Sequence, residues 1–186
     1  VIHGFKGEIT PAVLDGRTVN QITAYLIHFG PDDNPYVLRS NVGLVHSGTN
    51  INGKGFVLSS EQRAQFIAAQ RRNEERILPY LGAEEMNDSP TASHSRFTIY
   101  LDDLDEPGAK EWKELYGHLY ETVRVSRRNS SEQRLREQWW TYSRPAQALY
   151  DAIEGRKRIL ASGRAGGHIC FVFQPTTTIF SDSLTL

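Results

Sequence analysis

The stretch Leu135–Tyr150 reads LREQWWTYSRPAQALY and places two adjacent tryptophans among arginines. Neighbouring side chains point about 100° apart on a helix and about 180° apart on a strand, so Trp139 and Trp140 cannot both face one partner squarely. A DNA duplex also hides the faces of its bases, so stacking on aromatic rings suits single strands better. We therefore predict that at least one tryptophan is a core anchor, with Tyr142 and Tyr150 nearby, and that the surrounding arginines are the better candidates for contact with a partner.

The segments on either side of this stretch favour helices. Apolar residues recur every three or four positions from Trp112 to Val123, which predicts an amphipathic helix from Pro107 to about residue 125. The polar segment 124–136 continues that helix or forms a second one. Pro145 suits the first turn of a further helix that ends at Gly155, with Leu149 and Ile153 facing inward.

The C-terminal segments read as three closing strands: RILAS, HICFVF and TTIFSDSLTL. The middle strand alternates Ile169, Phe171 and Phe173. Cys170, the only cysteine, lies within it, where we expect a small buried hydrophobic side chain. A single cysteine permits no internal disulfide and suits a reducing cytoplasm, so we expect a cytoplasmic protein.

The N-terminal half alternates between strand and helix signals. The segment 19–29 suits a strand or a short helix, 42–46 a strand, 47–55 a loop rich in glycine and asparagine, and 56–58 a short strand.

Further along, Ser59 with Gln62 has the spacing of a capping box and begins a helix. ILPYLG, residues 77–82, resumes the helix until Pro79 and Gly82 stop it. RFTIYLDD, residues 96–103, alternates as a strand with one buried face. The order of elements has no regular βαβ alternation, so we expect an α+β fold with a mixed or antiparallel sheet and amphipathic helices.

The 186 residues suit one domain over 1–186, with residues 1–14 as a linker or an edge strand from a preceding domain. Because the chain starts without methionine and stops within a strand-like segment, we expect a fragment of a larger protein. No apolar run is long enough to span a membrane.

The charge is unevenly distributed. The chain carries a formal net charge of -1, which argues weakly against a nucleic-acid-binding protein. The segment 120–164 is nevertheless basic, and one basic face is enough to bind phosphates. A solvated helical surface is the alternative. The cations of this segment are Arg124, Arg127, Arg128, Arg134, Arg136, Arg144, Arg156, Lys157, Arg158 and Arg164.

Catalytic and metal-binding patterns are weak. DNPY, residues 33–36, lacks the second proline of the motif in amino-methyltransferases, and GKG, residues 53–55, is too short for a nucleotide loop. Glu111 and Lys113 follow an acidic segment as in metal-dependent nucleases, but on a helix they would point about 200° apart. The six histidines show no zinc spacing. We therefore expect no catalytic residues and no metal in this chain.

Several stretches together resemble the target-recognition domain of type IIL (MmeI-like) restriction–methylation enzymes and related class I SAM-dependent DNA adenine methyltransferases. Their order and approximate spacing match over most of the chain from about residue 15, although the run before the tryptophans is arginine-rich here and SGRAGGH is rich in glycine. The matching stretches are DGRTVNQITAYL, GKGFVLSSEQ, NEERILPYLGAEEMNDSP, SRFTIYLDD, REQWWTYSRPAQALYDAI and HICFVF…IFSDSLTL.

The resemblance implies a module without chemistry of its own that recognises double-stranded DNA and positions a methyltransferase domain of the same bacterial protein. That parent enzyme would use SAM to methylate adenine N6, with Mg²⁺ as a further candidate where a nuclease is present. The rivals are a protein-interaction or scaffolding domain, which predicts an exposed apolar patch, and a stand-alone nuclease or hydrolase.

Two sets of candidate residues follow from the separate tasks of gripping phosphates and reading base edges. Loop residues are expected to read bases, since asparagine suits adenine and arginine suits guanine. The base candidates are Asn50, Asn52, Arg164 and His168. The phosphate candidates are Lys54, Arg96, Arg124, Arg127, Arg128 and Arg164.

Overall fold

The computed structural model describes residues 11–23, 25–29, 38–166 and 170–186. The chain divides into two compact units, Val1–Val42 and Gly43–Leu186, each of which is described by itself. The first contains a hairpin of β1 (Ala12–Leu14) and β2 (Arg17–Val19) and the short 3-10 helix η1 (Arg39–Asn41). Asp15 and Gly16 take φ of 50° and 76° in its turn, the left-handed pair that a tight type I′ turn requires.

The second unit contains two sheets. The first is mixed, in the order β3-β5-β4-β8, with only the β4–β8 pair parallel; the second has the order β7-β6-β9 and is antiparallel. With the helices around them, these sheets confirm the expected α+β class. The strands are β3 (Val57–Leu58), β4 (Ile77–Leu81), β5 (Arg96–Ile99), β6 (Arg158–Gly163), β7 (Val172–Pro175), β8 (Ile179–Phe180) and β9 (Leu184–Thr185).

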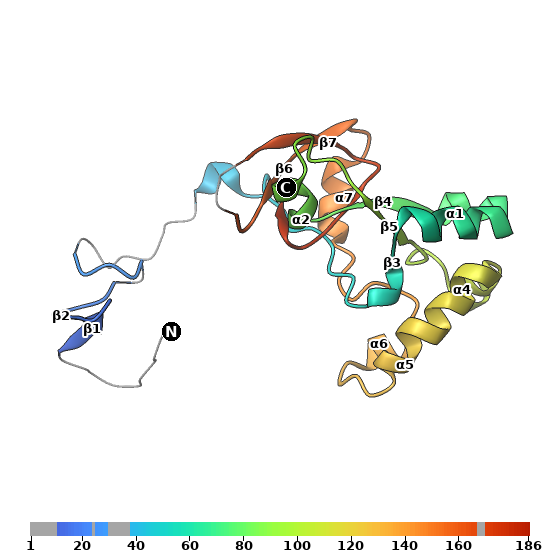
Figure 1. Ribbon diagram of the computed structural model, residues 1–186, viewed down its shortest axis with the longest axis horizontal. Coiled ribbons are helices and arrows are strands. Elements are labelled where there is room, and N and C mark those ends of the chain that lie inside the picture. Colours follow the sequence, from blue (N-terminus) through green and yellow to red (C-terminus); the bar gives the residue numbers. More distant parts are fainter. Residues whose placement is uncertain (1–10, 24, 30–37, 167–169) are drawn as a thin grey trace. The chain divides into compact units, whose positions relative to one another are not determined.

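The helices of the second unit lie at both ends of the mixed sheet. Figure 1 shows α1, α4 and α5 at one end and α7 and α2, beside β6 and β7, at the other. Among the described residues, no helix is both long and apolar enough to cross a membrane. The helices are η2 (Lys54–Phe56), α1 (Ser60–Ala69), η3 (Arg71–Arg76), α2 (Ala83–Asp88), α3 (Glu106–Lys110), α4 (Lys113–Leu119), the π-helix η4 (Tyr120–Arg124), α5 (Val125–Arg127), α6 (Gln133–Glu137) and α7 (Gln147–Ile153).

Both tryptophans are core residues, which confirms the prediction for the pair. Trp139 and Trp140 are 4% and 5% exposed. The Trp139 ring centroid lies 4.9 Å from that of Tyr116, and Trp140 Nε1 donates to the Leu104 carbonyl over 3.1 Å. Tyr142 is buried beside them, and its hydroxyl donates to the Ile99 carbonyl over 2.9 Å. The pair therefore joins the α4–η4 helices to the mixed sheet.

The predicted capping box is confirmed. The Ser59 hydroxyl accepts from the Gln62 amide over 3.2 Å, and Gln62 Oε1 accepts from the Ser59 amide over 2.9 Å. These two bonds satisfy backbone donors that the first turn of α1 leaves free. The predicted helix of 107–125 is present but is interrupted at Trp112, between α3 and α4.

Two predicted elements are wrong. ILPYLG forms the strand β4 rather than a helix. Pro79 is tolerated there because β8 pairs only with Tyr80 and Leu81, beyond the proline. The segment 42–46 is no strand, and Val42, Leu44 and Val45 are exposed. At its end, His46 exchanges two backbone hydrogen bonds with Leu186.

Two burial predictions also need correction. On β5, Thr98 and Ile99 are both fully buried, because both faces of this central strand are covered. Cys170 is exposed rather than buried. The predicted middle strand begins later than expected: Phe171 precedes β7 and Phe173 lies on it, and they are 63% and 57% exposed. Ile169 lies outside the described residues. Leu149 and Ile153 face inward, as predicted.

Candidate nucleic-acid interface

Backbone hydrogen bonds hold the start of the predicted loop 47–55 on both sides. The Thr49 amide donates to the Phe180 carbonyl over 2.6 Å, and Asn50 and Arg144 exchange backbone hydrogen bonds of 2.9 Å. Gly48 is needed between these contacts, because a Cβ there would lie 2.2 Å from the Ser181 carbonyl oxygen. The C-terminal strands on one side and the entry to α7 on the other therefore position Asn50.

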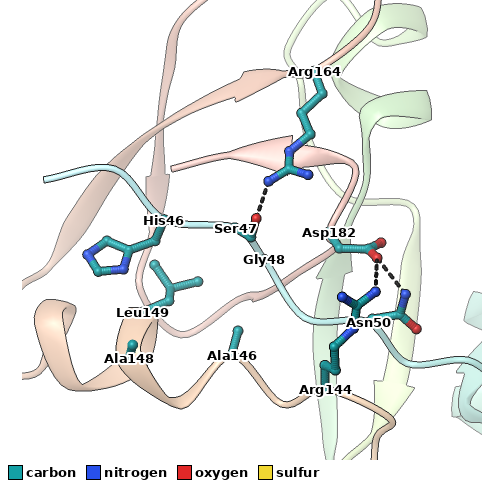
Figure 2. Close-up of a pocket in the computed structure, with 10 residues that line it drawn as sticks. All are labelled: His46, Ser47, Gly48, Asn50, Arg144, Ala146, Ala148, Leu149, Arg164 and Asp182. Atoms are coloured by element: carbon teal, nitrogen blue, oxygen red, sulfur yellow. Dashed lines mark hydrogen bonds and ion pairs between the residues drawn. The ribbon is translucent and has the colours of Figure 1, made fainter. Parts of the chain in front are cut away.

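An open pocket of about 310 Å³ lies beside this segment (Figure 2). Its wall combines the segment 46–50, the first turn of α7, and residues that follow β6 and β8. Two of the base candidates, Asn50 and Arg164, meet in this pocket although they are far apart in the sequence. The lining residues are His46, Ser47, Gly48, Asn50, Arg144, Ala146, Ala148, Leu149, Arg164 and Asp182.

Asp182 organises one wall of the pocket. Its Oδ2 accepts from Asn50 Nδ2 over 2.6 Å and lies 3.9 Å from an Arg144 guanidinium nitrogen. The Arg144 side chain is 77% exposed, so the single long ion pair leaves most of its donors free for a ligand. Because Asp182 holds one amide proton of Asn50, it also fixes which way the amide points.

Arg164 forms the opposite wall of the pocket. Its backbone amide donates to the Ser183 carbonyl over 3.0 Å, and its guanidinium donates to the Ser47 hydroxyl. The residue is exposed. The pocket thus presents two guanidinium groups and one amide against a single carboxylate, which favours a ligand that is anionic or rich in hydrogen-bond acceptors.

The prediction of a phosphate contact at Arg127 is wrong. Arg127 is 4% exposed, and its burial lowers the pKa of the guanidinium to about 10, so that it stays protonated at neutral pH. Its two terminal nitrogens donate to the carbonyls of Trp139, Thr141, Ile51 and Asn52, over 2.5 to 3.0 Å.

These four bonds join the two segments that present the pocket residues. Ile51 and Asn52 directly follow Asn50, and the segment 139–141 leads to Arg144. Arg127 therefore acts as a clamp within the core: it positions the candidate interface and is not available to a ligand.

Lys54, Arg124 and Arg128 form a second group of cations. Lys54 begins η2, which packs directly on η4, since a Cβ on Gly55 would lie 1.9 Å from Thr122 Oγ1. The Arg124 guanidinium lies 4.5 Å from the Tyr120 ring centroid, and Lys54 and Arg128 are exposed. The short segment 50–54 runs from the pocket to η2, so it connects the two groups of cations in the chain.

Arg96 is less available than the other phosphate candidates. Its Nε and Nη2 donate to the two carboxylate oxygens of Glu85 over 2.5 and 2.8 Å, and Glu84 lies 3.3 Å away. Burial is the largest effect on Glu85 and opposes its ionisation, but the bonds from Arg96 and from the backbone amides of Glu85 and Gly82 together outweigh it and lower the pKa of that carboxyl. Arg96 is thus committed to an ion pair between β5 and α2.

The remaining candidates differ in how the structure places them. Asn52 is exposed at φ 45°, and its carbonyl accepts from Arg127. His168 lies outside the described residues. Arg134 donates to the carbonyls of Tyr142 and Ser143, and so supports the segment before Arg144.

Sequence reasoning missed Asp182 as a site residue and counted Arg144 only within the basic segment. The serine- and aspartate-rich SDS within the last predicted strand was a signal for a turn there. The structure brings this turn to Asn50, 132 residues away in the chain.

Among the described residues, no group of three or more His, Cys, Asp or Glu is placed to hold a metal ion. Glu111 is the C-cap of α3 and Lys113 begins α4, so they share no strand pair as the predicted nuclease pattern would require. Asp102 is half-buried beneath Tyr142, whose amide donates to it over 2.9 Å, and loss of solvent around the carboxyl raises its pKa to about 7.

Comparison with known proteins finds a similar fold but no relative by sequence search. No protein-family model matches the chain, and no curated protein is similar to it in sequence. Among solved structures, the type IIL restriction-modification enzyme MmeI in complex with DNA is similar in fold, with a TM-score of 0.66 at 17% identity. The match covers 91% of this chain and 22% of the MmeI chain, so this chain spans about a fifth of that enzyme's length. The fold of this chain is thus one that occurs within a restriction-modification enzyme.

Proposed function

We propose that this chain is a sequence-specific double-stranded DNA recognition module of a bacterial restriction–modification methyltransferase. The observation that carries the proposal is the pocket where Asn50, Arg144 and Arg164 converge from three separate segments. The fold shared with an enzyme whose structure includes DNA supports it.

The two groups of cations suit the two tasks of such a module. Lys54, Arg124 and Arg128 bind phosphates, which fixes the register of the protein along the duplex. In the pocket, Arg144 or Arg164 donates two hydrogen bonds to guanine O6 and N7, and Asn50 pairs with adenine N6 and N7. Asp182 keeps the Asn50 amide in one orientation, as a base reader requires.

The catalytic step belongs to a separate methyltransferase domain of the same protein, which uses SAM to methylate adenine N6. The role of the present chain is to hold the duplex so that the target adenine reaches that domain. We place the protein in the cytoplasm, where its DNA substrate lies.

Selection from a library of duplexes with a randomised core tests this function. The wild-type chain is expected to return a consensus of a few base pairs, because each well-placed bidentate contact discriminates by about 1–3 kcal/mol. Asn50→Ala should relax one position of that consensus and leave the others. Arg71→Ala, a change of an exposed arginine on η3 outside the basic segment, is the control and should return the wild-type consensus. A library that emerges without enrichment would rule out sequence-specific recognition.

One observation favours the alternative, a protein-interaction or scaffolding domain. Leu160 on β6, Phe173 on β7 and Phe171 just before β7 are exposed, and an exposed apolar patch is what that alternative predicts. Self-association or capture of a protein partner that depends on these residues would support it.

A further inference from the structure

The outer face of the β6–β7 pair is apolar and exposed. Successive residues of a strand face opposite sides, and here Ile159, Ala161 and Val172 pack into the core with Leu149 and Phe180. Leu160 on β6 and Phe173 on β7 face outward and are 45% and 57% exposed, and Phe171, which directly precedes β7, is 63% exposed.

Leu160 and Phe173 form one patch, since they lie directly opposite each other in the antiparallel register. Phe171 lies two residues before Phe173 and directly before β7 begins, so it extends the exposed apolar residues past the end of the strand. The Arg158 guanidinium lies 4.1 Å from the Phe173 ring centroid, so a cation borders this ring.

Cations lie at one end of the patch. Arg156, Lys157 and Arg158 are exposed at the start of β6. Arg164, just beyond the other end of β6, instead directs its guanidinium to the Ser47 hydroxyl in the Asn50 pocket. The surface thus offers aromatic rings with positive charge at one end.

We propose that this face binds an unpaired nucleic-acid strand, with one base stacked on Phe171 and one on Phe173. An unpaired strand, whose bases are free to unstack, can place one base on each ring. Arg156, Lys157 and Arg158 then neutralise phosphates at the end of the patch beside Phe173. Positive grooves with aromatic rings are the general means by which proteins hold single strands.

Charge argues against a second copy of the chain as the occupant. A symmetric dimer would place the same patch on both copies face to face, and the exposed cations Arg156, Lys157 and Arg158 of each copy would then add like charges to that interface. Like charges across an interface oppose association, whereas a polyanion with planar bases satisfies both the rings and the cations.

Fluorescence anisotropy with labelled dT12 at low salt tests the proposal on the whole chain. Since stacking contributes about 1–3 kcal/mol per base, the double variant Phe171→Ala/Phe173→Ala should weaken dT12 binding at least about 20-fold. Its affinity for a 12-base-pair duplex should stay within about twofold of wild type. Because both rings are exposed, the thermal unfolding of the variant should match that of wild type, which is checked in parallel.

Two further variants separate stacking from mere apolar contact. Phe171→Tyr/Phe173→Tyr keeps the rings and should retain binding of dT12, whereas Phe171→Leu/Phe173→Leu keeps apolar area without a ring face and should lose it. Val125→Ala removes an exposed apolar side chain on α5 and is the matched control.

Three results would overturn the inference: no binding of dT12 by wild type, equal binding by the leucine variant, or self-association that the alanine variant abolishes. Each can occur while duplex recognition through the Asn50 pocket holds, so the two proposals fail separately.

Discussion

Neighbouring arginines with opposite environments give the sharpest test of the structure. Arg127 is buried and donates to four carbonyls, whereas Arg128 is exposed. Arg127→Ala should lower the free energy of unfolding by about 3–5 kcal/mol, since it leaves four carbonyls in the core without their charged donor. Arg128→Ala should lower it by less than about 0.5 kcal/mol, as surface changes do.

Urea denaturation followed by tryptophan fluorescence measures both changes, because the core tryptophans Trp139 and Trp140 lie beside the clamp. Arg127→Lys should fall between the two variants, since one ammonium cannot reach carbonyls on both segments as the planar guanidinium does. Arg128→Ala should also weaken duplex binding, although it changes stability little, because its exposed guanidinium is a phosphate candidate. A loss below about 1 kcal/mol for Arg127→Ala would refute its role as a clamp.

Three further changes test separate features. Gly48→Ala should lower stability by about 1–3 kcal/mol, because its Cβ would lie 2.2 Å from the Ser181 carbonyl oxygen, and urea midpoints check this. Burial raises the pKa of Asp102 from 3.8 to about 7, so the folded state binds this proton more tightly and stability falls as pH rises between those values. From pH 5 to pH 8, wild type should therefore lose on the order of 2 kcal/mol relative to Asp102→Asn, and parallel pH profiles would contradict this. Ser59→Ala removes the capping box of α1 and should cost about 1 kcal/mol in calorimetry; no change in melting temperature would contradict it.

Local signals in the sequence predicted much of the fold. The spacing of Ser59 and Gln62 located the start of α1, and the apolar periodicity from Trp112 to Val123 located α4 and η4. The prediction that at least one of the adjacent tryptophans lies in the core was correct, and the structure buries both. These features depend on residues within a few turns of each other, which is why one sequence suffices to find them.

Features that depend on distant partners were missed. Arg127 and Arg128 look alike in the sequence, and only the carbonyls of Ile51 and Asn52, some 75 residues away, distinguish the buried residue from the exposed one. Asp182 gained its role in the same way, through its bond to Asn50. The strand β4 was mistaken for a helix because β8, which pairs with it, comes from the other end of the chain.

The salt dependence of duplex binding tests the central claim most directly. The claim is that exposed cations of the second unit, Lys54 and Arg128 among them, neutralise phosphates of double-stranded DNA. Wild type should lose affinity steeply as salt rises, with a slope of about -0.9 in log Kd⁻¹ against log salt for each phosphate that is contacted. The double variant Lys54→Ala/Arg128→Ala should bind more weakly and give a shallower slope, whereas Arg71→Ala should match wild type. A wild-type affinity that stays flat between 50 and 200 mM salt, or equal slopes for all three proteins, would contradict the account.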